Sequence, residues 1–362
     1  MKKLRYLIMM LCVLLSLSGC SSSTLSTLHE EIGSTQTSAS TGNLSPLKVH
    51  YIDVGQGDSE LLQCKGVNIL IDTGESDQAT NLIAYLEKQG VKQIDHLFLT
   101  HPHTDHMGAA VKVMEHFPVK NVYLTNRTHT TVAYRKLIET IKNKNINRIQ
   151  AKAGLSISFA KNLKGKILAP NKKYEDINAS SIVMKVSYGK NSFLFTGDAT
   201  VETEMDILND GYDVSSDVYK VSHHGSSTSN SSSFLNAVNP SICVIEVGKN
   251  NSYGHPHKEI KERLTQMNTK VYRTDLNGSI VITSNGKKLS VKTTTGTATS
   301  SSSSSTNSST GNTKITYIGN KNSHVYHLPS CSSLPNKNNQ VTFQSKSAAV
   351  KAGYHACSRC HP

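Results

Sequence analysis

Residues 100–109 read THPHTDHMGA and place three histidines and one aspartate within six positions, at His101, His103, Asp105 and His106. Imidazole and carboxylate groups are ligands of zinc, manganese and iron in proteins. His101 and His103 point the same way from an extended segment, whereas Asp105 and His106 turn off toward a different site. One loop of this kind can serve two metals about 3.5–4 Å apart, the spacing of two-metal hydrolases. The sequence therefore predicts half of a dinuclear metal site.

Further side chains of ligand type follow apolar segments that are typical of strands. The segment FLFTGD ends at Asp198, a position that suits a carboxylate bridging two metals. The segment KVSHHGSS supplies one more imidazole from His223 or His224, and LIDTG brings Asp72 to the end of a strand. The segment SYGHPH adds His255 on a loop. Several such loops, each after an apolar strand, favour one shared site.

The chain between residues 47 and 293 alternates apolar strand patterns with helical patterns. The patterns predict strands at 48–54, 59–64, 67–72, 94–100, 181–189, 191–198, 217–222, 241–248, 270–274 and 278–283. They predict helices at 77–90, 132–144, 199–208 and 258–267. A strand-rich first half and a mixed second half suit an α/β fold with two sheets covered by helices.

The first residues, MKKLRYLIMMLCVLLSLSGC, combine a basic start with a short apolar run and small residues before Cys20. The run is too short for a spanning helix, so residues 1–20 are expected to be a secretion signal. The segment Leu17-Ser18-Gly19-Cys20 resembles a bacterial lipobox. It implies lipidation of Cys20 and a place on the extracellular face of the cell membrane, with the lipid as the only membrane contact. Simple secretion with cleavage nearby is the alternative.

Two low-complexity segments divide the rest of the chain. Residues 21–46 are rich in Ser and Thr and are expected to be a flexible tether, and residues 294–313 form a second linker. They delimit a central domain at 47–293 and a small domain at 314–362. Cys64 and Cys243 lie in strand patterns and are expected to be buried thiols, with a disulfide as the alternative.

The formal net charge of +13 is unevenly distributed. Residues 112–173 contain 14 Lys and Arg but two acidic residues, and no acidic residue follows Asp275. A solvated basic surface is one explanation of each stretch. Because the two stretches flank a candidate hydrolytic site, a polyanionic partner is favoured, such as nucleic acid, teichoic acid or an anionic membrane.

Residues 49–291 resemble the metallo-β-lactamase fold and, more narrowly, the hydrolase domain of ComEC-type DNA-uptake proteins. The narrower resemblance rests on YIDVGQGDSELLQ, ILIDTG, LTHPHTDHMGA, NASSIVMKV, FLFTGD, KVSHHGSSTS and NSYGHPH, which occur in that order. It implies a four-layer αββα sandwich that holds two divalent metals, Zn or Mn. The implied ligands are His101 and His103 for the first metal, Asp105, His106 and His223 for the second, and Asp198 as the bridge. The implied supporting residues are Asp72, Asp58, Asn178 and His224.

The chain departs from the wider superfamily at one position. Many members carry a histidine in a Gly-His turn before the bridging aspartate, whereas this chain has no histidine between His129 and Asp198. The segment DINASS occupies that place, with Asn178 as the nearest polar substitute. The departure supports the narrower resemblance over the lactamase, glyoxalase and lactonase branches. It predicts a first metal that is weakly held or depends on substrate.

The expected chemistry is hydrolysis by an activated water. Metals in such a site lower the pKa of a bound water to about 7 and neutralise charge on phosphoryl oxygens. Asp105 and His255 are the expected catalytic residues. His255, with Asp58 or Ser226, is expected to contact the substrate or protonate the leaving group.

The segments VYHLPSC and AGYHACSRCHP contain a second set of ligands. His327 and Cys331 are followed after 25 residues by Cys357 and Cys360, which suits one tetrahedral structural zinc. A domain this short needs such support, and one disulfide plus a free thiol is the alternative. The segment resembles the zinc-binding module of the DNA-repair protein Ada, whose first zinc-binding cysteine accepts a methyl group from DNA phosphotriesters. His327 occupies that position here, so contact with DNA phosphates is expected but methyl transfer is not.

These features predict a surface-anchored metallo-hydrolase, a nuclease or phosphodiesterase acting on DNA. A cell-wall phosphodiesterase acting on teichoic acid or phosphocholine groups is the alternative among enzymes. A DNA-capture lipoprotein with a vestigial site is the alternative outside them, and the intact ligand set speaks against it. The oligomeric state and the metal identity stay open.

Overall fold

The computed structural model describes residues 44–295, 317–327, 329, 331, 333–344, 348–349 and 352–357. The expected signal at residues 1–20, nearly all of the expected tether, Cys20 and Cys360 lie outside these ranges. The chain forms two compact units, residues 1–298 and 299–362. Within the described ranges, no helix has the length and apolar character needed to cross a membrane.

The first sheet of the larger unit has eight strands in the order β15-β14-β1-β2-β3-β4-β5-β6. Its strands are β1 (Leu47–Tyr51), β2 (Glu60–Cys64), β3 (Val67–Ile71), β4 (Ile94–Leu99), β5 (Val119–Leu124), β6 (Asn147–Gln150), β14 (Ile280–Ser284) and β15 (Leu289–Thr293). Strands β3 to β6 run parallel. Their carboxyl ends therefore meet at one edge, where Asp72 follows β3 and His101 follows β4.

The second sheet has seven strands in the order β13-β12-β11-β10-β9-β8-β7. Its strands are β7 (Ser156–Ala160), β8 (Leu163–Ala169), β9 (Val183–Tyr188), β10 (Asn191–Phe195), β11 (Val218–Lys220), β12 (Ile242–Ile245) and β13 (Lys270–Arg273). Strands β10 to β13 run parallel. Asp198 follows β10 and His223 follows β11, so both lie near the carboxyl edge of this sheet.

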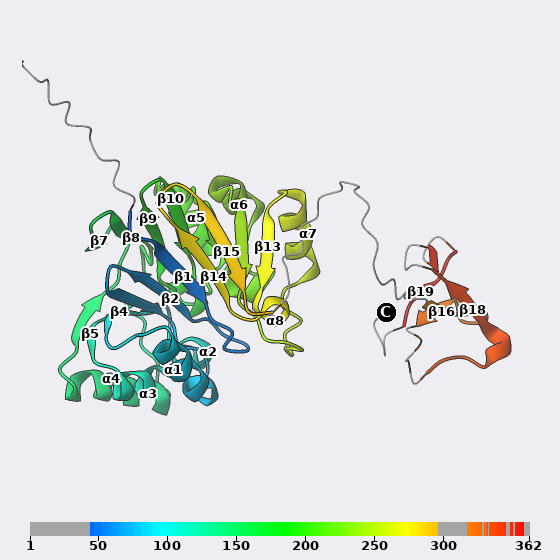
Figure 1. The fold of residues 1–362 in the computed structure, drawn as a ribbon, viewed down its shortest axis with the longest axis horizontal. Helices are drawn as coiled ribbons and strands as arrows, with labels where there is room; N and C mark the ends of the chain where they lie inside the picture. Colours follow the sequence, from blue (N-terminus) through cyan, green and yellow to red (C-terminus); the bar gives the residue numbers. More distant parts are fainter. Residues whose placement is uncertain are drawn as a thin grey trace, which may run out of the picture. The chain divides into compact units, whose positions relative to one another are not determined.

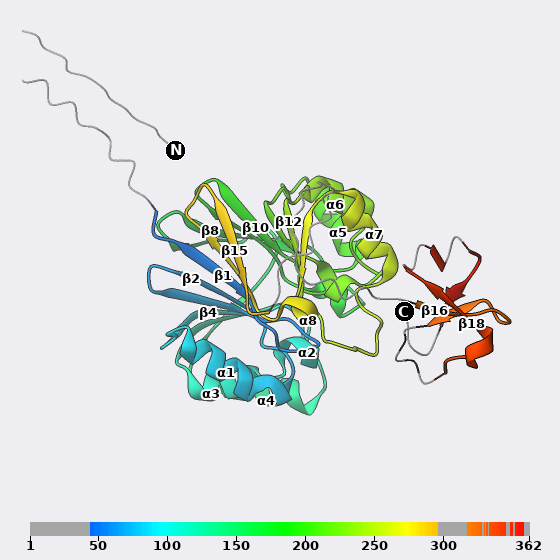
Figure 2. The same ribbon diagram turned by 45° about the vertical axis from the view of Figure 1, so that its right-hand side comes forward.

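Helices cover the outer faces of both sheets (Figures 1 and 2). The first sheet packs against α1 (Ala79–Lys88), α3 (Ala110–His116) and α4 (Val132–Asn143), and the second against α5 (Val201–Asn209), α6 (Ser232–Val238) and α7 (Lys258–Gln266). Besides the apolar cores between each sheet and its helices, a third core, which includes Tyr51, Phe98 and Phe195, fills the space between the sheets. The predicted four-layer αββα sandwich is confirmed. Short turns complete the unit, namely η1 (Ser76–Gln78), α2 (Thr104–Met107), η2 (Asn178–Ser180), η3 (Ser222–Gly225) and α8 (Thr274–Asn277).

All the strands and helices expected from the sequence are present. The structure adds β5 to β8, β15, α3 and α6, which the sequence patterns did not predict. Lys164 and Lys166 interrupt the apolar pattern of β8 because alternate side chains of this strand are exposed. Cys64 and Cys243 are buried free thiols, so the disulfide alternative is excluded.

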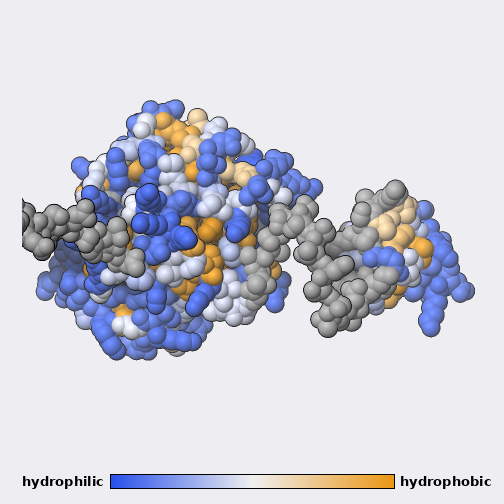
Figure 3. Space-filling view, turned by 45° about the horizontal axis from the view of Figure 1, so that its top comes forward, coloured by the Kyte–Doolittle hydropathy of each residue, from blue (hydrophilic) through white to orange (hydrophobic). Residues whose placement is uncertain are grey.

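The surface of the larger unit is predominantly polar. On the face shown in Figure 3, hydrophilic side chains prevail and apolar ones form scattered patches. Among the described residues, the large hydrophobic side chains that are strongly exposed are Val132, Val201, Met205, Tyr253 and Leu276.

The smaller unit contains a four-stranded sheet in the order β18-β16-β17-β19. Its elements are β16 (Tyr317–Asn320), β17 (Val325–His327), η4 (Lys337–Asn339), β18 (Gln340–Phe343) and β19 (His355–Ala356). The buried side chains among its described residues are Tyr326, His327, Cys331, Ala349 and Cys357. Potential metal ligands thus make up most of its interior.

Candidate metal centre

The histidine loop after β4 is fixed by backbone contacts. The amide of Thr73 donates to the carbonyl oxygen of His106 at 2.6 Å, and the amide of Asp58 donates to that of Asp105 at 3.2 Å. Gly108 is required at the end of α2 because a Cβ there would lie 2.4 Å from a carbonyl oxygen of the same turn. The loop conformation therefore depends on the neighbouring chain segments.

One side of Asp198 faces three further ligand-type groups. His106 Nε2 lies 3.2 Å and His224 Nε2 lies 3.6 Å from Asp198 Oδ1. Asp105 Oδ2 lies 3.7 Å from His106 Nε2 and 3.4 Å from His224 Nε2. The four ligand atoms all lie within 4.8 Å of one another. These residues, here called the Oδ1 set, have the composition of a divalent metal site.

Hydrogen bonds on the far side of each imidazole leave the Oδ1 set ready for a cation. His106 Nδ1 lies 2.8 Å from Asp72 Oδ2, and His224 Nδ1 lies 2.9 Å from the carbonyl oxygen of Glu246. Since these oxygens accept, each Nδ1 carries a proton, and in the neutral imidazole the lone pair is therefore on Nε2, the atom that faces the site. His106 Nε2, His224 Nε2 and Asp198 Oδ1 are buried and make no hydrogen bond. A bound cation would satisfy all three atoms, so the residues fit a metal.

The other oxygen of Asp198 faces a second group of imidazoles, here called the Oδ2 set. His223 Nε2 lies 3.4 Å and His101 Nε2 lies 3.9 Å from Asp198 Oδ2. His103 Nδ1 lies 3.0 Å from His101 Nε2. Asn178 Nδ2 lies 3.4 Å from His223 Nε2, so the expected polar substitute reaches this side. Two imidazoles near one carboxylate oxygen, with a third imidazole beside His101, could hold a second cation.

The structure places His223 and His224 on different sides of Asp198. The resemblance put His223 with Asp105 and His106, whereas His224 lies there and His223 lies in the Oδ2 set. Both residues adopt left-handed backbone angles, with φ of 52° and 54°. This conformation turns the chain sharply, so that the two successive imidazoles reach different oxygens of Asp198.

Burial and carboxylates act in opposite directions on the ligand histidines. Burial alone would lower the pKa of His106, but Asp198, Asp105 and Asp72 outweigh it and raise this pKa well above its usual value. For His101, burial and the neighbouring His106 lower the pKa well below its usual value. The Oδ1 set therefore has the stronger local negative field, which favours a cation.

A buried layer of charge lies behind the Oδ1 set. Asp58 is fully buried, with Oδ2 2.5 Å from Lys220 Nζ and Oδ1 3.2 Å from His224 Nδ1. Burial would raise the pKa of Asp58, but Lys220, His224 and His106 outweigh it and lower this pKa to about 2. Burial raises the pKa of Glu246 well above its usual range, and Glu60 raises it further. The expectation that Asp58 contacts substrate is therefore wrong, since the side chain supports ligands instead.

Members of both sets line a cavity of about 570 Å³, while His101 and His106 lie behind its wall. Its wall includes Gln56, Glu75, Pro102, His103, Thr104, Asp105, His129, Thr131, Asn178, Asp198, His223, His224, Tyr253 and His255. Burial and the neighbouring His224 lower the pKa of His255 to about 4, so this imidazole is neutral at pH 7. Ser226 is buried and contacts Thr228 Oγ1 rather than the cavity. Another cavity of about 500 Å³, on β7 to β9, is lined by lysines, serines, Asp213 and apolar residues and has no histidine.

Residues 52–145 match the family model of the metallo-beta-lactamase superfamily, and residues 304–362 match that of the metal binding domain of Ada. The chain has the metallo-β-lactamase fold. That fold implies divalent metals and hydrolysis, and the Ada-like domain implies zinc. The solved metallo-β-lactamase fold protein YhfI from Bacillus subtilis shares 14% identity at a TM-score of 0.44, over 66% of this chain and 100% of that one. CmlA, a diiron β-hydroxylase from Streptomyces venezuelae, shares 14% sequence identity at a TM-score of 0.45. The match covers 64% of this chain and 53% of CmlA.

Several relatives carry names connected with competence and recombination. ComE operon protein 3 of Bacillus subtilis is 31% identical over 64% of this chain and 32% of its own length. Recombination protein 2 of Haemophilus influenzae is 30% identical over 68% of this chain and 30% of its own length. Competence protein ComA of Neisseria gonorrhoeae is 32% identical over 63% of this chain and 31% of its own length. This chain therefore spans about a third of the length of these relatives.

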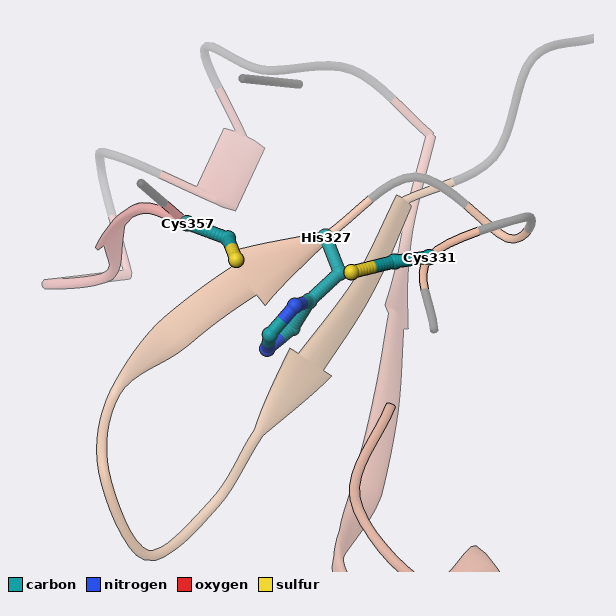
Figure 4. Close-up of side chains that lie close together, drawn as sticks. All are labelled: His327, Cys331 and Cys357. Carbon is teal, nitrogen blue, oxygen red and sulfur yellow. The ribbon is translucent and has the colours of Figure 1, made fainter. Parts of the chain in front are cut away.

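The smaller unit brings together three of its four expected ligands. Atoms of His327, Cys331 and Cys357 lie within 4.8 Å of one another, and all three residues are buried. Figure 4 shows the two cysteines approaching the histidine from different sides. His327 Nδ1 makes no hydrogen bond, which leaves it available to a cation. Cys360, the fourth expected ligand, lies outside the described ranges.

Proposed function

We propose that this chain is a metal-dependent phosphodiesterase that hydrolyses DNA, held at the extracellular face of the bacterial cell membrane by lipid on Cys20. The observation that carries the proposal is the arrangement around Asp198. Its two carboxylate oxygens each face a separate group of imidazoles, and members of both groups line one cavity. The side chains on the two sides of Asp198 would hold two divalent cations.

When bound, two divalent cations in such a site activate water and neutralise charge on the phosphoryl oxygens. The protein side chains fix the geometry. Asp198 ties the two sets together, and Asp72 and the carbonyl of Glu246 hold His106 and His224 in the tautomer that a ligand needs. Asp105, whose side chain is 25% exposed, faces the cavity and orients the attacking water.

His255 completes the cavity on the substrate side. Its ring lies 5.6 Å from that of His223 and 6.1 Å from that of His224, measured between centroids. With a pKa near 4 the imidazole is neutral at pH 7 and therefore serves as a hydrogen-bond partner of the substrate rather than as a charged acid. The proposed role is to hold the leaving group.

Three observations support DNA as the substrate. The relatives are named for competence and recombination. An Ada-like metal-binding domain follows the hydrolase unit. The net charge of +13 favours a polyanion and would make binding weaken as salt rises.

The test compares substrates for the full chain with Zn²⁺ or Mn²⁺. We expect cleavage of DNA oligonucleotides and no release of phosphocholine from a phosphocholine ester or of glycerol phosphate from a teichoic acid. Asp198→Asn should lower kcat on DNA on the order of 1000-fold or more, because it removes charge from both sets. His116→Ala, at an exposed histidine paired with Glu87, is the control and should leave kcat unchanged.

Two results would contradict the proposal. Full DNA cleavage by Asp198→Asn would place the activity outside this site, and cleavage confined to the wall polymers would replace DNA as the substrate. The anchor has its own test. Cys20→Ser should move the protein from the membrane fraction to the medium, and an unchanged membrane fraction would exclude a lipid on Cys20.

A further inference from the structure

Tyr253 is unusual among the aromatic residues of this chain. It is 65% exposed, while every other Phe and Tyr of the described residues is buried or half-buried. A single exposed apolar side chain needs no explanation by itself. The position of Tyr253 calls for an explanation, because this residue lines the same cavity as Asp105, Asp198 and His224.

The Tyr253 ring contacts one neighbouring ring and is otherwise largely exposed. The ring stacks on His255, with 5.6 Å between centroids and an interplanar angle of 20°. His255 in turn lies beside His223 and His224. The phenol therefore forms the outer end of a row of rings that begins at the metal ligands, and most of its surface is open to solvent.

The loop that carries Tyr253 is well ordered by its own hydrogen bonds. Asn251 Nδ2 donates to the carbonyl oxygens of Gly248 at 3.0 Å and His255 at 2.7 Å, and the amide of His255 donates to Asn251 Oδ1 at 3.0 Å. His257 Nε2 donates to the carbonyl oxygen of Tyr253 at 3.3 Å. A ring carried by a loop that is held in this way can bind a flat ligand with little loss of backbone freedom.

We propose that Tyr253 is a stacking platform for an unpaired nucleobase next to the scissile phosphodiester, so that the enzyme selects single-stranded DNA. The inference rests on the proposed function and names its substrate class. A planar base gains contact area on an exposed tyrosine face, and such stacking does not depend on base sequence. Glycerol phosphate and phosphocholine have no planar ring, and a duplex keeps its base faces covered.

The experiment distinguishes binding of the nucleobases from binding of the sugar-phosphate chain of the DNA. An oligothymidylate and an oligomer of the same length built from abasic residues carry the same charge, and only the first can stack. We expect Tyr253→Ala to raise KM for oligothymidylate about 5- to 100-fold, the range that loss of one stacked base implies. KM for the abasic oligomer should not change. Anisotropy of labelled oligomers in an Asp198→Asn background should show the same pattern in Kd.

Two variants serve as controls. Tyr253→Phe keeps the ring and should bind oligothymidylate like the unmodified chain. Leu276→Ala removes another strongly exposed apolar side chain, which is 55% exposed and absent from the cavity wall. This variant should leave KM for both oligomers unchanged. A blunt duplex of the same length should be a poorer substrate than the single strand, and Tyr253→Ala should reduce that preference.

The outcomes distinguish this inference from the function on which it rests. Equal loss on oligothymidylate and abasic oligomer, or no loss on either, would overturn the stacking role while leaving DNA hydrolysis intact. Absence of hydrolysis with every DNA substrate would overturn both. Failure of Tyr253→Phe to match the unmodified chain would mean that the hydroxyl, rather than the ring face, makes the contact.

Discussion

The two candidate metal centres differ in what holds their ligands in place. In the larger unit the ligands follow strands of two sheets, and Asp72 and Asp58 contact ligand histidines from behind. In the smaller unit His327, Cys331 and Cys357 are themselves among the few buried side chains of the described residues. The scaffold thus positions the ligands in the first centre, whereas in the second we expect a bound metal to hold the scaffold together.

The centres also differ in access. Asp105, Asp198, His223 and His224 line a cavity of about 570 Å³, so a substrate can reach both sides of Asp198. The three ligands of the smaller unit are each exposed by 7% or less. Catalytic metal sites keep an open position, while structural sites are closed by protein ligands. The same perturbation should therefore act on folding in one unit and on chemistry in the other.

Removal of metal should give the largest difference between the units. Zinc binding contributes about 10–16 kcal/mol to the folding of small zinc modules, more than a short chain can supply otherwise. We expect a strong chelator to expose the amides of β16 and β17 to rapid hydrogen exchange. Amides of β4 and β10 should stay protected, because their sheets have apolar cores of their own.

Two variants sharpen this experiment. Cys331→Ser should reproduce the exchange pattern of the chelated smaller unit without any chelator. His324→Ala, which removes a ring packed on Tyr354 but absent from the ligand cluster, should not. Protection of β16 that survives chelation would refute the view that metal holds this unit together.

Lys220 should give the next largest effect, and it acts on the larger unit. Lys220→Met leaves the buried carboxylate of Asp58 without its cation, which costs about 3–5 kcal/mol for a buried pair. Lys185→Met is the matched control, because its partner Asp213 is 75% exposed and such pairs contribute about 0–1 kcal/mol. Urea unfolding followed by circular dichroism measures both. Equal midpoints for the two variants would show that the buried charge layer does not stabilise the scaffold.

Lys220 also shows where sequence reasoning ends. The loop at His101–His106 and the strand ends at Asp72 and Asp198 were predictable, because apolar strand patterns mark where parallel strands stop. In DVYKVS, Lys220 has the pattern of an outward-facing strand residue. It is buried because β11 is a central strand of the second sheet, and its partner Asp58 comes from a segment 162 positions earlier in the chain.

The sequence is also insufficient to place the two adjacent histidines after β11. The sequence HHG indicates that an imidazole reaches the site, but not which one faces which oxygen of Asp198. That choice depends on the left-handed backbone angles of His223 and His224, which no side-chain pattern encodes. The exposure of Tyr253 is likewise a property of how its loop is held, since a tyrosine between Ser252 and Gly254 suggests only a turn.

His223 and His224 provide the third prediction, about which cation each supports. We expect His224→Ala to lose the cation of the Oδ1 set and His223→Ala that of the Oδ2 set, so each variant keeps about one metal per chain in the larger unit. Each should lose more activity than the about 10- to 100-fold typical of changes outside the ligand shell. Elemental analysis and kcat on DNA measure the two effects. Two cations retained by His224→Ala would return the second site to His223.

Asp72 gives the smallest effect and tests the scaffold of the first centre most directly. Asp72→Asn keeps the shape, but its amide can donate to His106 Nδ1 and so favour the tautomer with a proton on Nε2, the ligand atom. We expect metal affinity to fall about 10- to 100-fold, as for other residues that orient a ligand, with hydrogen exchange of β4 unchanged. Asp95→Asn is the control, because this buried carboxylate accepts from Lys120 and the amide of Asn68, away from the histidines. Equal metal affinity in both variants would mean that the cation selects the tautomer of His106 for itself, and the contrast between a scaffold-made and a metal-made centre would then apply to the backbone alone.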